Sequence, residues 1–184
     1  LSTVRGLTYR VRNQVVSNPD RGLIRDLDAL PFPARHLFDL SRYTLCTPNG
    51  EPMATILSSR GCPYNCSYCF KGTVGRTYRQ RSPDSIINEM QEVITRYGIN
   101  SFYFIDDLFT IDAKRLAQIT DRIVAEKMDV RWQCLGRVDR VDPESLRRMY
   151  AAGCRRIHYG IESGNQEILN RIGKDTTIEQ VRQA

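Results

Sequence analysis

The sequence predicts an α/β protein built around a parallel sheet, with about four β/α units that form part of a TIM-like barrel. Short apolar runs alternate with amphipathic helical patterns from about residue 53 onward. Two of these patterns begin at serine or aspartate followed by proline and stop at glycine, the preferred residues for these helix boundaries. Strands and helices alternating at this spacing form parallel units with right-handed crossovers. Because four parallel strands do not close a barrel, we expect more of the barrel to follow in a longer parent protein.

Residues 1–50 have an irregular pattern. The stretch YRVRNQVV, at residues 9–16, predicts a short hairpin. The following LDALPFPARHLF contains Pro31 and Pro33, which exclude a regular element there and favour an extended connector.

The first β/α unit is predicted at residues 53–98. MATILSS is a short apolar strand that leads into a cysteine-rich loop. Ser82 is placed to cap a helix whose first residue is Pro83, and Gly98 is placed to end it. The apolar residues of this helix recur at helical spacing and predict one buried face: Ile86, Ile87, Met90, Val93, Ile94 and Tyr97.

Further strands and helices follow the same rhythm. Apolar runs predict strands at residues 101–105, 130–135 and 155–161. Amphipathic patterns predict helices at residues 111–127, 143–152, 165–172 and 177–184. Asp142 and Pro143 mark the start of the second of these helices, and Gly153 marks its end.

The net charge of +6 arises from 27 basic and 21 acidic residues. A positive field can attract nucleic acid or anionic metabolites. The charges are interspersed, however, and no block of five like charges occurs, so we interpret them as a mixed solvated surface and expect no nucleic-acid partner. Five basic residues lie around the cysteine-rich loop, and we expect them to be ordinary surface or substrate-side charges, with neutralisation of negative charge at that loop as the alternative: Arg60, Lys71, Arg76, Arg79 and Arg81.

The location follows from two features of the sequence. No run of about 18 or more uncharged apolar residues occurs, so no membrane span is predicted. The first residues lack the apolar core of a secretion signal. Without such a signal, closely spaced cysteines indicate metal or redox chemistry more than disulfides, so we predict a reducing cytoplasm.

The stretch CPYNCSYC places Cys62, Cys66 and Cys69 within eight positions. Structural zinc needs four ligands, commonly as two pairs, whereas His36 and His158 lie far away in the sequence. Disulfides would leave one thiol unpaired. A cubane iron–sulfur cluster held by three thiolates leaves one iron without a protein ligand, and that iron is free to bind a substrate or cofactor. We favour the cubane, with zinc and disulfides as the alternatives.

The C-x3-C-x2-C spacing, placed just after the first strand of a β/α series, resembles the signature of the radical S-adenosylmethionine enzymes. This resemblance implies the radical SAM type of partial barrel. It also implies that the amino and carboxylate groups of S-adenosylmethionine bind the open iron of a [4Fe–4S] cluster. Reductive cleavage would then give methionine and a 5′-deoxyadenosyl radical that abstracts hydrogen from the substrate. Cofactor and cluster carry this chemistry, while the protein positions them.

The resemblance also implies where S-adenosylmethionine binds. Tyr68 stands where the family usually has an aromatic residue whose backbone and ring meet the adenine; the alternative is an aromatic that only packs under the loop. Asp106 and Asp107 follow a strand where the family often has GGE, which binds the methionine ammonium, so this chain departs from the family there. Adjacent strand residues face opposite ways, and we expect one aspartate to face the site. Alternatively, the pair caps the following helix.

Two further strand ends carry polar candidates. Arg137, in GRVDR, is expected to pair with the methionine carboxylate, with a surface salt bridge as the alternative. GIESG resembles what many family members carry after the fourth strand, and it implies that Glu162 and Ser163 bind the ribose hydroxyls. The alternative for this segment is a plain turn. Cys134 and Cys154 are interpreted as small core residues, and Cys46 has no assigned role.

Nearly the whole chain resembles one subgroup, in which a cobalamin-binding domain precedes the barrel. The stretches that carry this resemblance are LIRDLDALPFPARHLFDL, SRGCPYNCSYCF, IDDLFT and GIESGNQEILNRIGK. The subgroup includes cobalamin-dependent methyltransferases and the anaerobic magnesium-protoporphyrin ester cyclase. We therefore expect residues 1–50 to be a connector that follows a cobalamin-binding domain, and residues 51–184 to be part of the radical SAM core. The expected partners are a small-molecule substrate and an electron donor such as flavodoxin or ferredoxin.

Two other functions remain as alternatives. A methylthiotransferase that modifies tRNA or a ribosomal protein would suit the basic charge, but it would need a further cluster domain and an RNA-binding tail. A non-enzymatic zinc or iron–sulfur module is the other alternative.

Overall fold

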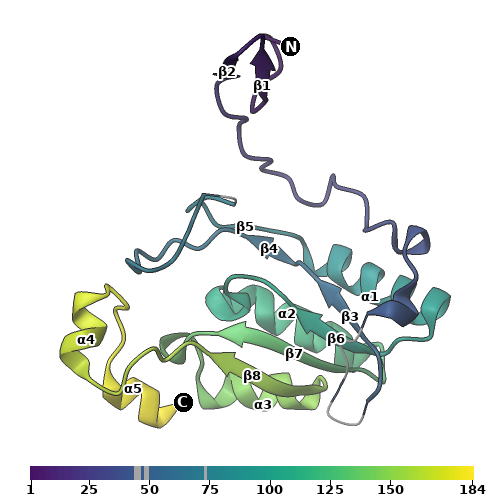
Figure 1. Cartoon of the computed structure of the whole chain (residues 1–184). Coiled ribbons are helices and arrows are strands. Elements are labelled where there is room, and N and C mark those ends of the chain that lie inside the picture. The colour runs from purple at the N-terminus through teal and green to yellow at the C-terminus, as the bar shows by residue number, and fades with distance from the viewer. Residues whose placement is uncertain (44–46, 48–49, 73) are drawn as a thin grey trace.

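A four-stranded parallel sheet forms the centre of the molecule (Figure 1). The computed structural model describes residues 1–43, 47, 50–72 and 74–184. The strands lie in the order β3-β6-β7-β8, so each strand pairs with its successor in the sheet, and every pair is parallel. They are β3 (Met53–Ile56), β6 (Ser101–Phe104), β7 (Arg131–Gly136) and β8 (Cys154–Tyr159). The predicted α/β class and parallel order are confirmed.

Three helices cover one face of this sheet (Figure 1). They are α1 (Pro83–Tyr97), α2 (Ala113–Ala125) and α3 (Pro143–Ala151). The core lies between the two layers, where Phe102, Phe104 and Trp132 of the strands are buried. Facing them are buried apolar side chains of the helices: Ile86, Ile87, Met90, Val93, Ile119, Ile123 and Met149. The predicted buried face of α1 is thereby confirmed, with Ile94 and Tyr97 partly buried at its edge.

The helix boundaries follow from side-chain caps. The Ser82 hydroxyl accepts a hydrogen bond from the Ser85 amide at 3.1 Å, and Gly98 ends α1 with a φ of 65°. Asp142 caps α3 as predicted. The cap of α2 is Asp112, whose carboxylate accepts from the Arg115 amide at 3.0 Å. The alternative in which the adjacent aspartates at 106 and 107 cap this helix is therefore wrong.

The remaining elements lie at the two ends of the chain and beside the cysteines. The predicted hairpin is confirmed, and it lies apart from the sheet at the end of an extended connector (Figure 1). Where the structure describes it, the connector contains short 3-10 turns at Arg35–Leu37 and Leu40–Arg42. The other elements are β1 (Thr8–Val11), β2 (Gln14–Ser17), β4 (Ser59–Arg60), β5 (Arg79–Gln80), α4 (Gln166–Arg171) and α5 (Ile178–Gln183).

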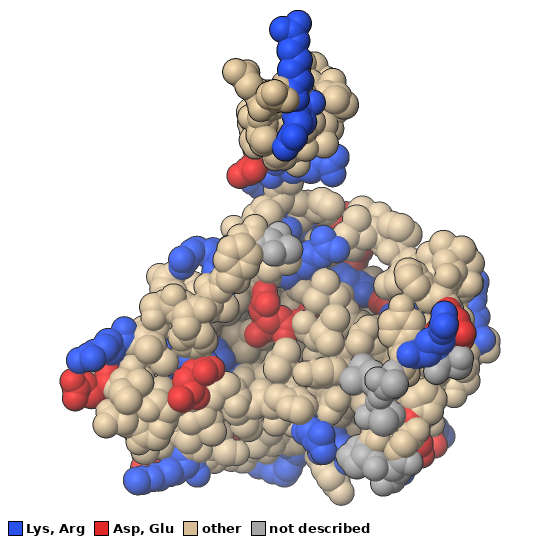
Figure 2. Space-filling view, viewed as in Figure 1, with Lys and Arg blue, Asp and Glu red and all other residues tan. Residues whose placement is uncertain are grey.

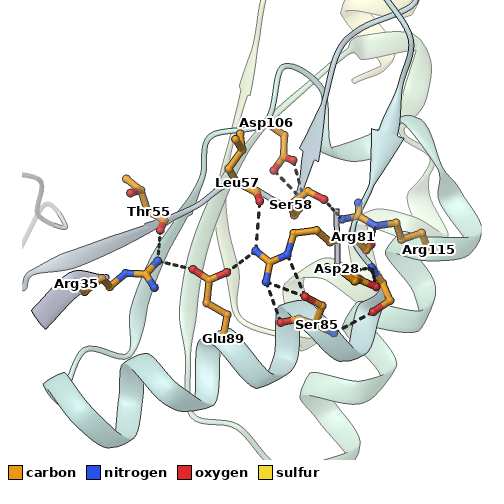
Figure 3. A network of polar contacts seen from close by, with 11 residues as sticks. Asp28, Arg35, Thr55, Leu57, Ser58, Arg81, Ser85, Glu89, Asp106 and Arg115 are labelled. Atoms are coloured by element: carbon orange, nitrogen blue, oxygen red, sulfur yellow. Dashed lines mark hydrogen bonds and ion pairs between the residues drawn. The ribbon is translucent and has the colours of Figure 1, made fainter. Parts of the chain in front are cut away.

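A network of ion pairs fastens the connector to the sheet and to α1 (Figure 3). Arg35 of the connector donates to the Thr55 carbonyl at 2.8 Å and pairs with Glu89 of α1 at 2.5 Å. Arg81 pairs with the other oxygen of Glu89. Asp28 accepts from the Ser82 amide at 3.0 Å. The expectation that Arg79 and Arg81 are ordinary surface charges is wrong, because both are buried, Arg81 within this network.

Charges are mixed on the visible surface. Figure 2 shows basic side chains on the hairpin and around the periphery, with acidic ones among them and near the centre of this face. No continuous basic stripe crosses this face, in agreement with the predicted mixed surface. Among the described residues, no helix is both long and apolar enough to cross a membrane.

Candidate functional site

The three clustered cysteines lie on a loop whose two ends are paired. Strands β4 and β5 form a short antiparallel ladder, with Ser59 opposite Gln80 and Arg60 opposite Arg79. The chain from Gly61 to Tyr78 therefore begins at the end of β4 and returns to the same ladder at the start of β5. Cys62 is buried, Cys66 is partly buried and Cys69 is exposed, and all three are free thiols. The loop thus presents three possible thiolate ligands on a segment that is closed at its base.

Gly61 allows this closure. Its φ is +85°, and a Cβ at this position would lie 2.4 Å from the Thr77 carbonyl oxygen. Only glycine combines the left-handed backbone with so close an approach of another backbone segment.

We expect Gly61→Ala to loosen the base of the loop and to lower its iron loading. The left-handed backbone alone costs an alanine about 1–2 kcal/mol, and the contact with Thr77 adds to that cost. Hydrogen–deuterium exchange of the β4 and β5 amides, together with iron per chain after reconstitution, measures the effect. Gly22→Ala is the control, because nothing lies within 4 Å of its Cβ. Unchanged exchange and iron content in Gly61→Ala would contradict this role.

The far side of the loop is held by the strand ends and by the turn after α4. Arg137 stacks on the Tyr64 ring, with its guanidinium carbon 3.7 Å from the ring centroid. Arg140 donates to the Tyr64 hydroxyl at 2.5 Å. The Ser67 amide donates to the Ile172 carbonyl at 2.9 Å. Segments far apart in the sequence therefore fix the loop between its ligand positions.

Tyr68, Glu162 and Lys174 meet beside the third cysteine. The Lys174 ammonium lies 3.0 Å from the Tyr68 hydroxyl and 3.3 Å from Glu162 Oε1. Burial, followed by the hydrogen bond with Glu162 and the nearby Cys66, raises the pKa of Tyr68, so this phenol stays protonated at neutral pH. The structure thus brings together two predicted site residues, Tyr68 and Glu162. Sequence reasoning did not predict Lys174 as a site residue. Its one local signal is its position directly after Gly173, which follows the short helix α4.

The backbone at Glu162 is unusual. Its φ is +71°, a left-handed conformation that non-glycine residues seldom adopt. A Cβ at Gly160 would lie 2.8 Å from Glu162 Oε1 and 3.2 Å from the Lys174 ammonium. Gly160 therefore gives the Glu162–Lys174 pair the space to lie against the strand end. Ser163 is adjacent, and its hydroxyl accepts from the Asn165 amide at 3.1 Å.

The two adjacent aspartates have different environments. Asp106 is fully buried. Its carboxylate accepts from the Ser58 hydroxyl at 3.0 Å (Figure 3) and from the Ser59 hydroxyl at 2.6 Å. Burial raises the pKa of Asp106, although these hydrogen bonds and Arg115 oppose the rise. Asp107 is exposed. Asp106 therefore anchors the chain that enters the cysteine loop, and Asp107 is the one that faces outward.

Arg137 is already engaged by the protein. It is buried and pairs with Asp139 at 2.8 Å, and it also donates to the Lys174 carbonyl at 2.7 Å. The predicted alternative of a salt bridge is present, but it lies in the interior rather than at the surface.

The donor set agrees with a cubane cluster. Cys134 and Cys154 lie in β7 and β8 within the hydrophobic core, as predicted, so neither is on the loop. Cys46 is outside the described residues. In the described part of the chain, no three Cys, His, Asp or Glu side chains are arranged to hold a single metal ion. Each thiolate of a cubane binds a different iron, so three loop thiols that do not converge on one point still match its requirements.

Two curated relatives match nearly the full length of the chain. The chain is 34% identical over 181 residues to an uncharacterized methyltransferase of Pyrococcus horikoshii, covering 98% of the chain and 39% of that protein. It is 29% identical over 185 residues to the anaerobic magnesium-protoporphyrin IX monomethyl ester cyclase of Cereibacter sphaeroides, covering 98% of the chain and 30% of that protein. The chain thus spans less than two-fifths of the length of either relative.

A solved structure and a family model also match. The fold superimposes on the cobalamin-dependent S-adenosylmethionine radical enzyme OxsB with a TM-score of 0.78 at 24% identity, covering 98% of the chain and 27% of OxsB. This likeness identifies the four-stranded sheet as a partial TIM-like barrel. The model of the radical SAM superfamily matches residues 56–184, which include all three loop cysteines and the Tyr68–Lys174–Glu162 cluster. Since this match covers more than half of the chain, the protein belongs to the radical SAM superfamily.

Proposed function

We propose that Cys62, Cys66 and Cys69 bind a [4Fe–4S] cluster and that S-adenosylmethionine binds at the iron without a protein ligand. Proteins of the radical SAM superfamily bind this cluster and this cofactor. The observation that carries the assignment is the position of three free thiols on a loop closed at its base, next to Tyr68 and Glu162. When bound, the cluster would supply the electron for reductive cleavage of S-adenosylmethionine.

The proposed contacts of the cofactor follow from which groups are still available. Tyr68 would border the adenine, since half of its surface is exposed. Glu162 would accept from the ribose hydroxyls through Oε2, because Oε1 faces Lys174, and Ser163 lies beside it. Asp107 is the aspartate we assign to the methionine ammonium, because Asp106 is enclosed by serines.

We assign Arg137 to holding the cysteine loop. Its guanidinium is occupied by Asp139, by the Lys174 carbonyl and by the face of Tyr64. Of its five N–H donors, the two on Nη1 have no acceptor among the described residues, so they would remain for the methionine carboxylate of the cofactor. Arg137 would therefore hold the loop through Nε, Nη2 and its face, and pair with that carboxylate through Nη1.

For the whole protein, we propose a cobalamin-dependent methyltransferase or cyclase that acts on a small molecule. The similarity to a methyltransferase, to a cyclase and to the fold of OxsB supports this proposal. Residues 1–50 would then connect a cobalamin-binding domain to the barrel at residues 51–184. A flavodoxin or a ferredoxin would supply the electron. The mixed charge in Figure 2 does not favour an RNA-modifying methylthiotransferase.

Anaerobic reconstitution of the full-length protein tests this proposal. We expect a brown protein with about four irons per chain that forms deoxyadenosine when dithionite and S-adenosylmethionine are added. Addition of hydroxocobalamin should give bound corrin absorbance, which tests the assignment to the cobalamin-dependent group separately. A colourless protein that holds one zinc and does not cleave S-adenosylmethionine would contradict the proposal.

A further inference from the structure

We propose that Lys174 is a positioning residue for S-adenosylmethionine, acting by holding Glu162 and Tyr68 at a fixed separation. This inference rests on the proposed function and extends it to a residue outside the cysteine and GIESG motifs. Lys174 lies in the turn after α4, whereas Tyr68 is in the cysteine loop and Glu162 follows β8. Three separate segments therefore converge on one ammonium group.

The environment of the ammonium is costly unless it is paired. The Lys174 side chain is only 9% exposed, and lysine is seldom buried without partners. Its partners in the described part of the chain are the Tyr68 hydroxyl at 3.0 Å and Glu162 Oε1 at 3.3 Å. An ammonium has three N–H donors. Two described acceptors leave one donor for a further group at this place, such as an oxygen of a bound nucleoside.

The backbone of Lys174 is fixed independently of its side chain. Its carbonyl accepts from Arg137 at 2.7 Å, and its amide donates to the Leu169 carbonyl at 3.0 Å. The preceding Gly173 has a φ of +63°, and a Cβ there would lie 3.3 Å from the Asn65 carbonyl oxygen in the cysteine loop. The root of the lysine side chain is thus fixed by backbone contacts, and it should stay in place when the side chain is altered only at its tip.

The partners of Lys174 are the two groups assigned to the nucleoside. Lys174 occupies Oε1 of Glu162 and orients Oε2, so the carboxylate presents one defined oxygen to a diol. The left-handed backbone at Glu162 is strained, and the ion pair offsets part of that strain. At its other contact, Lys174 holds the Tyr68 hydroxyl directly before the third cysteine. One side chain therefore contacts both the group assigned to the ribose and the group assigned to the adenine.

The test is the binding of S-adenosylmethionine to the full-length, cluster-loaded protein, measured by equilibrium dialysis without reductant. Lys174→Met keeps the aliphatic stem and removes the ammonium. We expect iron per chain to remain at the wild-type level and the Kd to rise about 10- to 100-fold, the range for loss of a charged hydrogen bond. Lys174→Arg should recover part of the affinity. Lys114→Met, at an exposed lysine in α2, is the matched control and should bind like wild type.

A double-mutant cycle with Glu162→Gln shows whether the two residues act together. If Lys174 acts through Glu162, the combined variant should lose little more affinity than the weaker-binding single variant. Additive losses, or wild-type affinity in Lys174→Met, would overturn the inference. So would a fall in iron content in Lys174→Met, because the lysine would then hold the cysteine loop and not the cofactor contacts. If the wild-type protein itself binds neither cluster nor S-adenosylmethionine, the proposed function fails first.

Discussion

Replacing Cys62, Cys66 or Cys69 by alanine, one at a time, is expected to abolish cluster loading and cleavage of S-adenosylmethionine. Each variant leaves two thiolates on the loop, and no other described cysteine lies there to replace the lost ligand. Loss of a partner that merely orients a metal ligand costs roughly 10- to 100-fold in metal affinity or activity, and loss of a ligand itself should cost more. Iron per chain and deoxyadenosine formation in the reconstituted full-length protein measure the effect.

Cys154→Ala is the control for these variants. Cys154 is a buried free thiol in β8, and its sulfur lies 3.6 Å from the Arg156 carbonyl. Its replacement removes a small core side chain but no loop thiol, so the iron content should remain at the wild-type level. Full iron loading in all three loop variants would remove the central assignment. Loss of iron in Cys154→Ala would show that loading reports on general stability.

Glu89→Gln is expected to destabilise the packing of α1 by about 3–5 kcal/mol, the cost of removing one partner from a buried ion pair. The Glu89 side chain is 1% exposed and accepts from both Arg35 and Arg81, whose side chains are 11% and 10% exposed (Figure 3). The neutral amide leaves two arginines without a compensating charge. Hydrogen–deuterium exchange of the α1 amides in the full-length protein should accelerate about 100-fold or more.

A second glutamate on the same helix supplies the control. Glu92 pairs with Arg96 at 3.2 Å, and the Arg96 side chain is 63% exposed. Exposed pairs contribute about 0–1 kcal/mol, so Glu92→Gln should change the exchange of α1 only slightly. Equal effects of the two substitutions would show that burial of the Arg35–Glu89–Arg81 network does not determine the stability of this helix.

The sequence predicts the sheet and its helices because their signals are local. Ser82 and Asp142 are followed by proline at the first helical position, and both cap helices in the structure. The apolar spacing of α1 likewise predicts its buried face. The local sequence signal for Asp112 as the cap of α2 is weaker. A 3-10 turn at Phe109–Ile111 separates Asp112 from β6, and the aspartates at 106–107 lie closer to the end of that strand.

The partners of the charged residues depend on tertiary contacts that no local pattern contains. Arg81 lies just before α1 and eight residues from Glu89, but Arg35 joins them from 54 residues away from Glu89. Lys174 is 106 residues from Tyr68. Period and spacing report which face of an element is buried. They do not report which distant side chain contacts a given charge. The partners of Lys174 and of the buried arginines are therefore identified by the three-dimensional structure.

The ladder at the base of the cysteine loop has a consequence for the cost of holding a cluster. With its ends joined by β4 and β5, the segment forms a ring that is closed by backbone pairing and not by the thiols. Ring closure for a flexible segment of this size costs on the order of 2–3 kcal/mol, and here the pairing of β4 with β5 bears that cost. A cluster held by the three cysteines would then have only the chain inside this ring to restrict.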